Sequence, residues 1–422
     1  MISAKRNWVK CGLSLLLAGA IFLSMGIWSL FASAVSAQPR DDSAKVGESL
    51  PGGAYKVTQL NVPVEDGLYY AKMNLKHSES SGRDSMGNAA LRGSDAYLEK
   101  YPEDTDYRQL ISIKDGKATA ILEFMPMGYI GMYGFMMELE AVNTTAFKLS
   151  PLDDYTTYTP ATVLAEHRTT TGEVVHDPFN DPDSDSVFDG SNPATMTRPA
   201  GQYGRDEAIV VDIVDQAYSH IFALDVTPIS IEGIGDLPED YKEWGINQAA
   251  YVHVFVPVMG SIVITSGDQL ARVQVDWTSL EKVDNPEENV QYQMYLASEI
   301  EKGNYTDSSY KALQTAISEV KETLSNIWPS QDLELTGTGF NKTPILNQKE
   351  FTDEEQKKLS KKLTDAVNAL EEKGDKSSLN TLITEAEAKA EDNYTPNSWI
   401  EFSTKLTAAK NVQNDDNASV SD

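Results

Sequence analysis

The sequence predicts a chain in two parts, an all-β sandwich or barrel followed by an all-α part built from helical repeats. Short segments in which apolar and polar residues alternate, separated by turn residues, run through 55–283. From residue 303 onward the apolar residues recur every three or four positions instead, as on one face of a helix. The segments 304–321 and 393–410 match each other, which indicates that one helical unit occurs twice.

Composition and charge restrict the classes of function. The 422 residues include 35 Lys and Arg against 64 Asp and Glu, a formal charge of −29, with 41% hydrophobic and 9% aromatic residues. A chain of this length and aromatic content can form two or three folded domains. Nucleic acid is not an expected partner, because its phosphates require a basic face on the protein. No nucleophile elbow, Walker loop or dinucleotide fingerprint is present, so we expect no enzyme.

The N-terminus has the pattern of an export signal. Basic residues precede an apolar run that ends in small side chains, which predicts a signal peptide over 1–37 and cleavage before Gln38. An uncleaved N-terminal anchor is the alternative, because the run is long enough to cross a bilayer. Both alternatives place the chain in a secreted or cell-surface location. The single cysteine, Cys11, lies within this segment, so the mature chain has no disulfide.

The β part is expected over 55–283, after a linker at 38–54 that is rich in Pro, Gly and charge. The alternating pattern predicts its strands at 68–75, 110–113, 118–125, 135–142, 208–214, 251–258 and 270–277. Asp115-Gly116 between the second and third of these is the pair preferred in a type I′ hairpin turn. Residues 144–205 are rich in Thr, Asp, Pro and Gly, and we interpret them as an acidic insertion.

The helical part is expected to begin after a linker at 284–302, with one module over 303–373 and a second, truncated module over 374–422. Thr306 is the predicted N-cap of the first amphipathic helix. Thr352 and Glu355 form a predicted capping box at the start of another helix. The charged faces of these helices are typical of a solvated spacer.

Two resemblances to known families add to this interpretation. The segments DGLYYAKMNLKHS, DSMGNAAL, IKDGKATAILEF, YVHVFVPVM and ARVQVDW resemble, in this order, the NEAT (near-transporter) domain. That resemblance implies an immunoglobulin-like sandwich in which haem lies between a short helix and the final hairpin. The helical repeats resemble FIVAR modules of bacterial surface proteins. Together they imply a Gram-positive cell-envelope protein that acquires iron.

The chain departs from the NEAT pattern at the iron ligand. Haem-binding members carry a Tyr at the start of the last strand and another four residues later, whereas this chain has no Tyr between Pro257 and Trp277. Met is also a competent axial ligand, although Met more often fills irregular cores. The candidate haem-binding residues are Ser85, near a propionate, and the iron-ligand candidates Met86, Tyr129, Met132 and Met259.

The acidic insertion carries a second candidate site. Carboxylates at alternate positions are the pattern in which calcium loops surround a hard cation with oxygen atoms. The candidate calcium ligands are Asp181, Asp183, Asp185 and Asp189. Ser186 stands where an EF-hand has Gly, so a solvated acidic loop is the alternative.

Two functional hypotheses follow. The first is a surface protein whose β part captures haem or a haemoprotein, held away from the envelope by the helical modules. The second is an adhesin or other interaction protein that has lost haem binding and binds a host protein or a glycan. A purely structural spacer is a third, weaker alternative.

Overall fold

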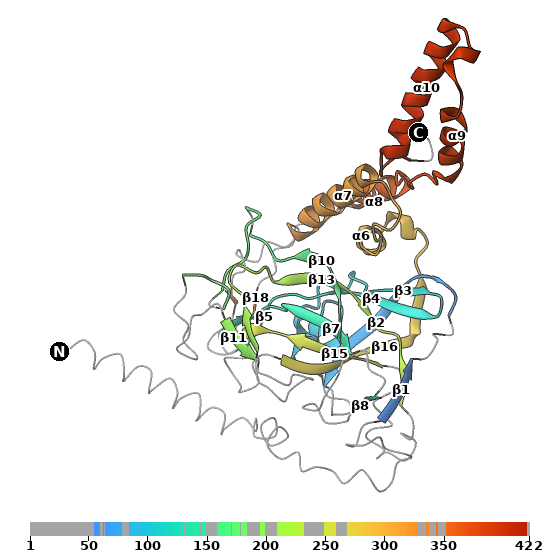
Figure 1. The fold of residues 1–422 in the computed structure, drawn as a ribbon. Helices are drawn as coiled ribbons and strands as arrows, with labels where there is room; N and C mark the ends of the chain where they lie inside the picture. The colour runs from blue at the N-terminus through green and yellow to red at the C-terminus, as the bar shows by residue number, and fades with distance from the viewer. Residues whose placement is uncertain are drawn as a thin grey trace, which may run out of the picture.

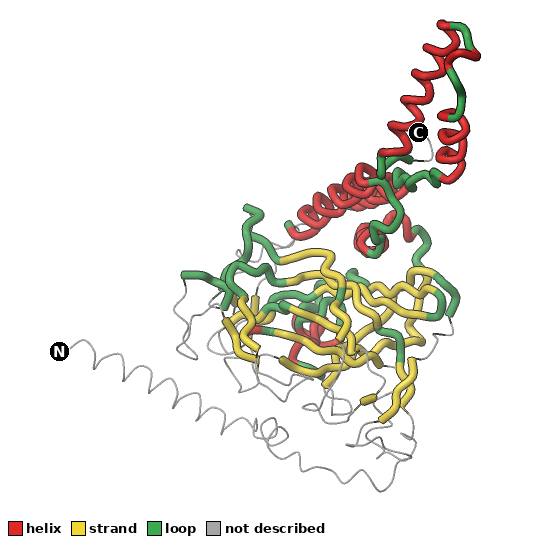
Figure 2. Tube along the Cα trace, in the orientation of Figure 1, coloured by secondary structure: helices red, strands yellow, loops and turns green. Residues whose placement is uncertain are grey.

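The computed structural model shows a β domain that carries a helical part on one side (Figures 1 and 2). At the far end of the helical part, a pair of helices projects away from the β domain. The residues that the structure describes are 55–59, 62, 64–77, 84–129, 132–142, 146–147, 158–169, 171–177, 179–183, 195–198, 209–231, 249–258, 268–326, 335–336, 343–344 and 352–419. The predicted signal peptide and the linker that follows it lie outside these residues. No helix among the described residues is long and apolar enough to span a membrane.

The main sheet has nine strands, all paired antiparallel. In spatial order they are β10 (Thr162–Glu166), β13 (Ser219–Asp225), β4 (Lys117–Glu123), β3 (Leu110–Lys114), β2 (Gly67–His77), β16 (Asp268–Lys282), β15 (Ala249–Phe255), β7 (Glu138–Val142) and β9 (Tyr158–Pro160). One residue, Ala161, separates the edge strands β9 and β10 along the chain. The two edges therefore meet, and the sheet is nearly closed.

The hairpin of β3 and β4 forms as predicted. Asp115 and Gly116 have φ angles of 52° and 75°, the positive values that a type I′ turn requires at both central residues. Lys114 pairs with Lys117 across this turn, which fixes the register of the two strands. The other predicted strands also form, with different ends: the strand predicted at 135–142 begins at Glu138, the one at 208–214 covers Ile209–Asp212, and the one at 251–258 ends at Phe255.

Both faces of part of the sheet are buried. Along β4, Ala118, Ala120 and Leu122 point into the core that the rolled sheet encloses. Ile121 points to the opposite face, where it packs with residues of the helical part. Strands buried on both faces show no simple alternation of apolar and polar residues. For the same reason β13 was not predicted from the sequence.

The acidic segment 144–205 contributes strands to the main sheet, in contrast to the expected insertion. Both β9 and β10 come from this segment, and β10 pairs with β13. Its consecutive apolar residues Val163, Leu164 and Ala165 pack in two different cores. Val163 packs in the core that the sheet encloses, and Leu164 and Ala165 pack in the core that the sheet shares with the helices. Such a run lacks the alternation by which strands were identified.

Short strands form four small sheets beside the main one. Their members are β1 (Tyr55–Gln59) with β8 (Ala146–Phe147) and β14 (Ile229–Ile231), β5 (Met127–Tyr129) with β6 (Met132–Gly134), β11 (Thr195–Arg198) with β12 (Ile209–Asp212), and β17 (Leu335–Thr336) with β18 (Thr343–Pro344). Two short helices, η2 (Met86–Ala89) and α3 (Asp95–Lys100), follow β2 in the chain.

The first helical module packs directly on the β domain. It consists of α6 (Val290–Ser298), α7 (Asp307–Ser325) and α8 (Asp353–Asn368), preceded by the single turn η5 (Pro286–Glu288). Thus η5 and α6 together occupy most of the segment 284–302, which was expected to be a linker. Met294, Leu313 and Leu363 share one core with Leu110 and Ile121 of the sheet. Helices and sheet therefore bury a common apolar surface.

The helix caps form where the sequence predicted them. The Thr306 side chain accepts a hydrogen bond from the Ser309 amide at the start of α7. Thr352 and Glu355 make both bonds of a capping box at the start of α8. The second module contains α9 (Ser377–Glu387), the turn η7 (Glu391–Asn393) and α10 (Pro396–Asn414).

Candidate functional site

On the side of β3, no strand in the described part of the chain pairs with the second half of β2. Strand β3 pairs only with Gly67–Tyr70 of β2. Beyond that point two side-chain amides take the place of a strand: Gln109 Oε1 accepts a hydrogen bond from the Met73 amide at 2.6 Å, and Asn88 Oδ1 accepts one from Leu75 at 2.7 Å. Met73 and Leu75 are fully buried, so without these oxygens their N–H groups would lose their partners.

Residues 84–91, which we call the lip, lie along this uncovered edge of β2. The Ser85 amide donates to the Leu75 carbonyl at 2.9 Å, and the Ser85 side chain caps η2 by accepting from Gly87. A Cβ atom at position 87 would lie 3.0 Å from a methyl carbon of Leu75, so the close approach favours glycine. Met86 is half-buried in the lip.

A row of polar and aromatic residues crosses the sheet beside the lip. Asp84 pairs with Lys76 of β2, Lys76 is opposite Arg272 of β16, and Arg272 is opposite Tyr251 of β15. We call these four residues the cross-strand row. Residues directly opposite each other in a sheet share a face, so the four side chains lie on one face. The lip and β16 flank β2, which places them two strand spacings, about 10 Å, apart.

The inner part of the cross-strand row is buried. Arg272 and Tyr251 are 1% and 3% exposed, and Arg272 Nε donates to the His77 carbonyl at 3.1 Å. Burial lowers the pKa of the Arg272 guanidinium, and attraction to Tyr251 partly opposes this effect. A phenol beside a guanidinium is chemically suited to stabilise a phenolate, and a tyrosine phenolate can bind haem iron.

Sequence reasoning did not select Tyr251 as a ligand. The NEAT pattern places the ligand in the last strand, and this chain has no Tyr between Pro257 and Trp277, whereas Tyr251 lies in the strand before it. His253 does pack: it is 1% exposed, and its Nδ1 lies 2.9 Å from Glu140 Oε2. The pairing of Tyr251 with Arg272 depends on the register of β15 and β16, which the sequence alone does not determine.

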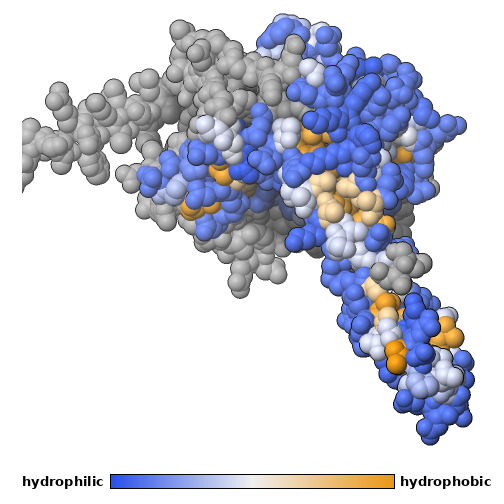
Figure 3. All heavy atoms as spheres, turned by 90° about the horizontal axis from the view of Figure 1, so that it is seen from above, coloured by the Kyte–Doolittle hydropathy of each residue, from blue (hydrophilic) through white to orange (hydrophobic). Residues whose placement is uncertain are grey.

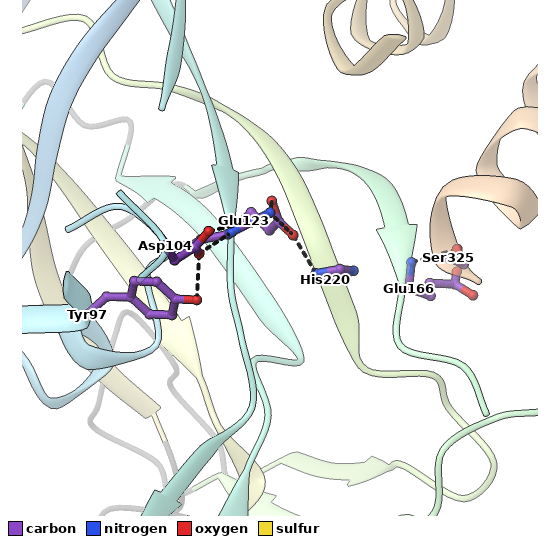
Figure 4. A network of polar contacts seen from close by, with 7 residues as sticks. Tyr97, Asp104, Glu123, Glu166, His220 and Ser325 are labelled. Atoms are coloured by element: carbon purple, nitrogen blue, oxygen red, sulfur yellow. Dashed lines mark hydrogen bonds and ion pairs between the residues drawn. The ribbon is translucent and has the colours of Figure 1, made fainter. Parts of the chain in front are cut away.

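An ionic network holds the chain immediately after the lip (Figure 4). Arg92 donates to Asp104 through Nε at 2.7 Å and Nη2 at 2.9 Å, and through Nη1 to Glu123 at 3.2 Å. Tyr97 donates its hydroxyl to Asp104 at 2.8 Å, and His220 Nε2 lies 3.1 Å from Glu123. Because Glu123 belongs to β4, the network fastens the end of the lip to β4 of the main sheet.

This network is internal and charged. Burial alone would raise the pKa of Glu123, but Arg92 and His220 outweigh it and hold that pKa at about 2. The His167 ring stacks on His220 with centroids 4.5 Å apart. Burial, followed by repulsion from His220, lowers the pKa of His167 well below its ordinary value. Glu123, His167 and His220 are all at most 1% exposed, so the arrangement supports the lip and offers no surface to a substrate.

The remaining predicted haem residues lie in two other places. Tyr129 of β5 pairs with Met132 of β6, so these two neighbour each other in a two-stranded sheet. That sheet begins shortly after Met125, whose amide donates to the Ala90 carbonyl of the lip at 2.7 Å. Met259 lies outside the described residues.

The predicted calcium ligands are only partly described. Asp181 Oδ1 accepts a hydrogen bond from the Asp183 amide at 2.9 Å, which closes a local turn, and both residues are at least partly exposed. Asp185 and Asp189 lie outside the described residues. Over the ranges that the structure does describe, no group of three or more His, Cys, Asp or Glu side chains is placed to hold a metal ion.

No family model matches the chain, and no curated protein matches it. Among solved structures the chain is similar to a mutant IsdX2-NEAT5 domain in complex with heme, at 9% sequence identity and a TM-score of 0.22. The similarity covers 50% of this chain and 97% of that one.

Proposed function

We propose that the chain is an exported cell-surface protein of the NEAT type, which captures haem or a haemoprotein at the lip end of its β domain. In this proposal the nearly closed sheet is a modified immunoglobulin-like fold, and the helical modules are of the FIVAR type. The function is binding, without turnover. The proposal rests on the side chains of the lip and the cross-strand row.

The observation that carries the proposal is the position of Tyr251 opposite Arg272, with Lys76 next in the same cross-strand row. Haem is a flat apolar ring with an iron atom that takes axial ligands and with two propionate carboxylates. Tyr251 would ligate the iron, and the two cations would face the carboxylates, although the chain as a whole is strongly acidic. The half-buried Met86 and the Ser85 hydroxyl of the lip would contact the ring and a propionate.

Met86, Tyr129, Met132 and Met259 remain alternative ligands for the iron. A thioether ligand and a phenolate ligand give different haem spectra, because the anionic oxygen of the phenolate stabilises ferric iron. Met86 is the alternative that lies in the lip itself. Tyr129 would bring a ligand from a different sheet.

A haemin titration of the mature chain tests the proposal. We expect a saturating Soret band at one equivalent, which Tyr251→Phe shifts and weakens at least tenfold. Tyr69→Phe is the matched control: Tyr69 is a buried tyrosine in β2, and its hydroxyl bonds the Glu65 carbonyl. A titration that never saturates would overturn haem capture. Equal behaviour of the two variants, with loss of the band in Met86→Ala or Tyr129→Phe, would reassign the ligand.

The second candidate function is an interaction protein that binds a host protein or glycan. The near-complete burial of Tyr251 favours it, because a haem ligand must be reached from solvent. In that case the lip and its ionic network serve the stability of the sheet, and haemin gives only the spectrum of free haemin.

A further inference from the structure

The second helical module repeats the first two helices of the first module. The residues of α10, and those of α9 from Leu379 onward, have counterparts in α7 and α6 whose numbers are lower by 89, and the paired helices end at the same positions. The repeat therefore extends to the first helix of each module, beyond the segments that match most closely in sequence. The buried α6 residues and their α9 counterparts are Val290 and Leu379, Met294 and Ile383, and Ala297 and Ala386.

In the first module α8 covers one side of the pair α6 and α7. Thr364 of α8 donates its hydroxyl to Gln293 Oε1 at 3.2 Å, and Ser360 donates to the Glu288 carbonyl at 2.9 Å. Lys362 of α8 makes an ion pair with Glu319 of α7. Positions 288, 293 and 319 therefore mark the side of the helix pair that faces α8.

The sheet covers another side of the same pair. The Tyr295 hydroxyl lies 3.2 Å from the Thr119 hydroxyl of β4, and Lys321 donates to Glu166 of β10 at 2.7 Å. Positions 295 and 321 therefore mark the side that faces the sheet. Gln293 and Tyr295 are only two residues apart in α6, yet they contact different neighbours.

In the second module these two sides differ in polarity. The counterpart of Gln293 is Leu382, which is 62% exposed, and no described helix covers it as α8 covers Gln293. The counterparts of Tyr295 and Lys321 are Thr384 and Lys410, and Lys410 pairs with Glu387 at 2.6 Å. Figure 3 shows apolar side chains exposed along this projecting pair. The side equivalent to the sheet contact is thus polar, and the side equivalent to the α8 contact is apolar.

We propose that the pair α9 and α10 binds an amphipathic helix of the α8 kind on the side marked by Leu382. Such a helix has a stripe of Leu and Val spaced three or four residues apart, with lysines on its flanks. The first module supports this occupant, because α8 itself covers the equivalent side there. Glu288 and Glu319, which pair with lysines of α8, correspond to the uncharged Ser377 and Ala408. The acid available to a flanking lysine in the second module is Glu385, which is exposed one turn beyond Leu382. The proposal is independent of haem binding.

Binding of a labelled peptide of residues 350–373 to the mature chain, followed by fluorescence anisotropy, tests this proposal. Leu382→Lys should weaken binding at least tenfold, because a leucine buried on binding is replaced by a charge beside the peptide lysines. Thr384→Lys is the matched control, since it adds the same charge on the same helix but on the side that corresponds to the sheet contact. We expect it to change the affinity less than twofold.

Three results would overturn the proposal. The first is that the peptide does not bind saturably, and the second is that Leu382→Lys and Thr384→Lys weaken its binding equally. The third is that a peptide with Leu359 and Leu363 replaced by Ser binds as tightly as the original peptide. Sedimentation of the chain alone tests a second copy as the occupant. A concentration-dependent dimer that Leu382→Lys dissociates would assign this surface to self-association and would also overturn the proposal. Far-ultraviolet circular dichroism confirms that each variant keeps its helices.

Discussion

The side-chain amide of Asn88 is the group in the lip whose loss should destabilise the sheet most. Asn88 is fully buried, and its Oδ1 accepts the hydrogen bond of the Leu75 amide at 2.7 Å. In Asn88→Ala the backbone N–H of Leu75 stays buried but loses its acceptor, which lowers the free energy of unfolding by about 1–3 kcal/mol. For a domain of this size the midpoint of thermal unfolding should fall by roughly 3–10 °C.

Two measurements check this expectation. Thermal unfolding gives the overall loss, and hydrogen exchange of the segment around Leu75 shows where it arises, since its amide should exchange faster in the variant. Asn368→Ala is the control: Asn368 is an exposed residue at the end of α8, where alanine has the better helix propensity. If Asn88→Ala unfolded at the wild-type temperature with a protected Leu75 amide, the lip would not act as a substitute strand.

Three further predictions follow from the cores and caps. Burial and then His220 lower the pKa of His167 below its ordinary 6.5, so the unfolded chain binds the proton first. The free energy of unfolding is therefore not reduced by His167 above pH 6.5, and it falls as the pH drops below 6.5. Midpoints of urea unfolding measured about one pH unit above and below 6.5 would show this difference. Leu363→Ala should cost about 2–5 kcal/mol and lower the stability of sheet and helices together in urea, because Leu363 lies in their common core. Thr352→Ala should cost about 1 kcal/mol by loss of the capping box, measured by chemical denaturation against Thr381→Ala as a mid-helix control.

Much of the fold could be predicted because the local sequence determines it. The Asp115-Gly116 turn, the caps at Thr306 and Thr352, and the repeated helix are each specified by a few adjacent residues. By contrast, β10 has three consecutive apolar residues because it separates two cores. That pattern becomes intelligible only when the helices are known to pack on the sheet.

The candidate site was less predictable because it depends on pairings between distant segments. Ser85 and Met86 are predicted from the sequence as site residues, and the structure places them in the lip. The row that joins Lys76, Arg272 and Tyr251 depends on the register of three strands. A shift of one residue would move Tyr251 to the opposite face, so no pattern within one strand reveals its neighbours.

The anchoring of the lip indicates which side of the proposed site must move to admit a ligand. Asn88 ties the lip to β2, the Ser94 hydroxyl donates to the Asn88 carbonyl at 2.6 Å, and Arg92 joins the ionic network. These bonds come from separate segments, so opening the lip would break several at once. Access to the buried Tyr251 is therefore expected from the side of β15, and added haemin should change hydrogen exchange in β15 more than in residues 84–91. Greater change in the lip would place the moving part there and contradict this reasoning.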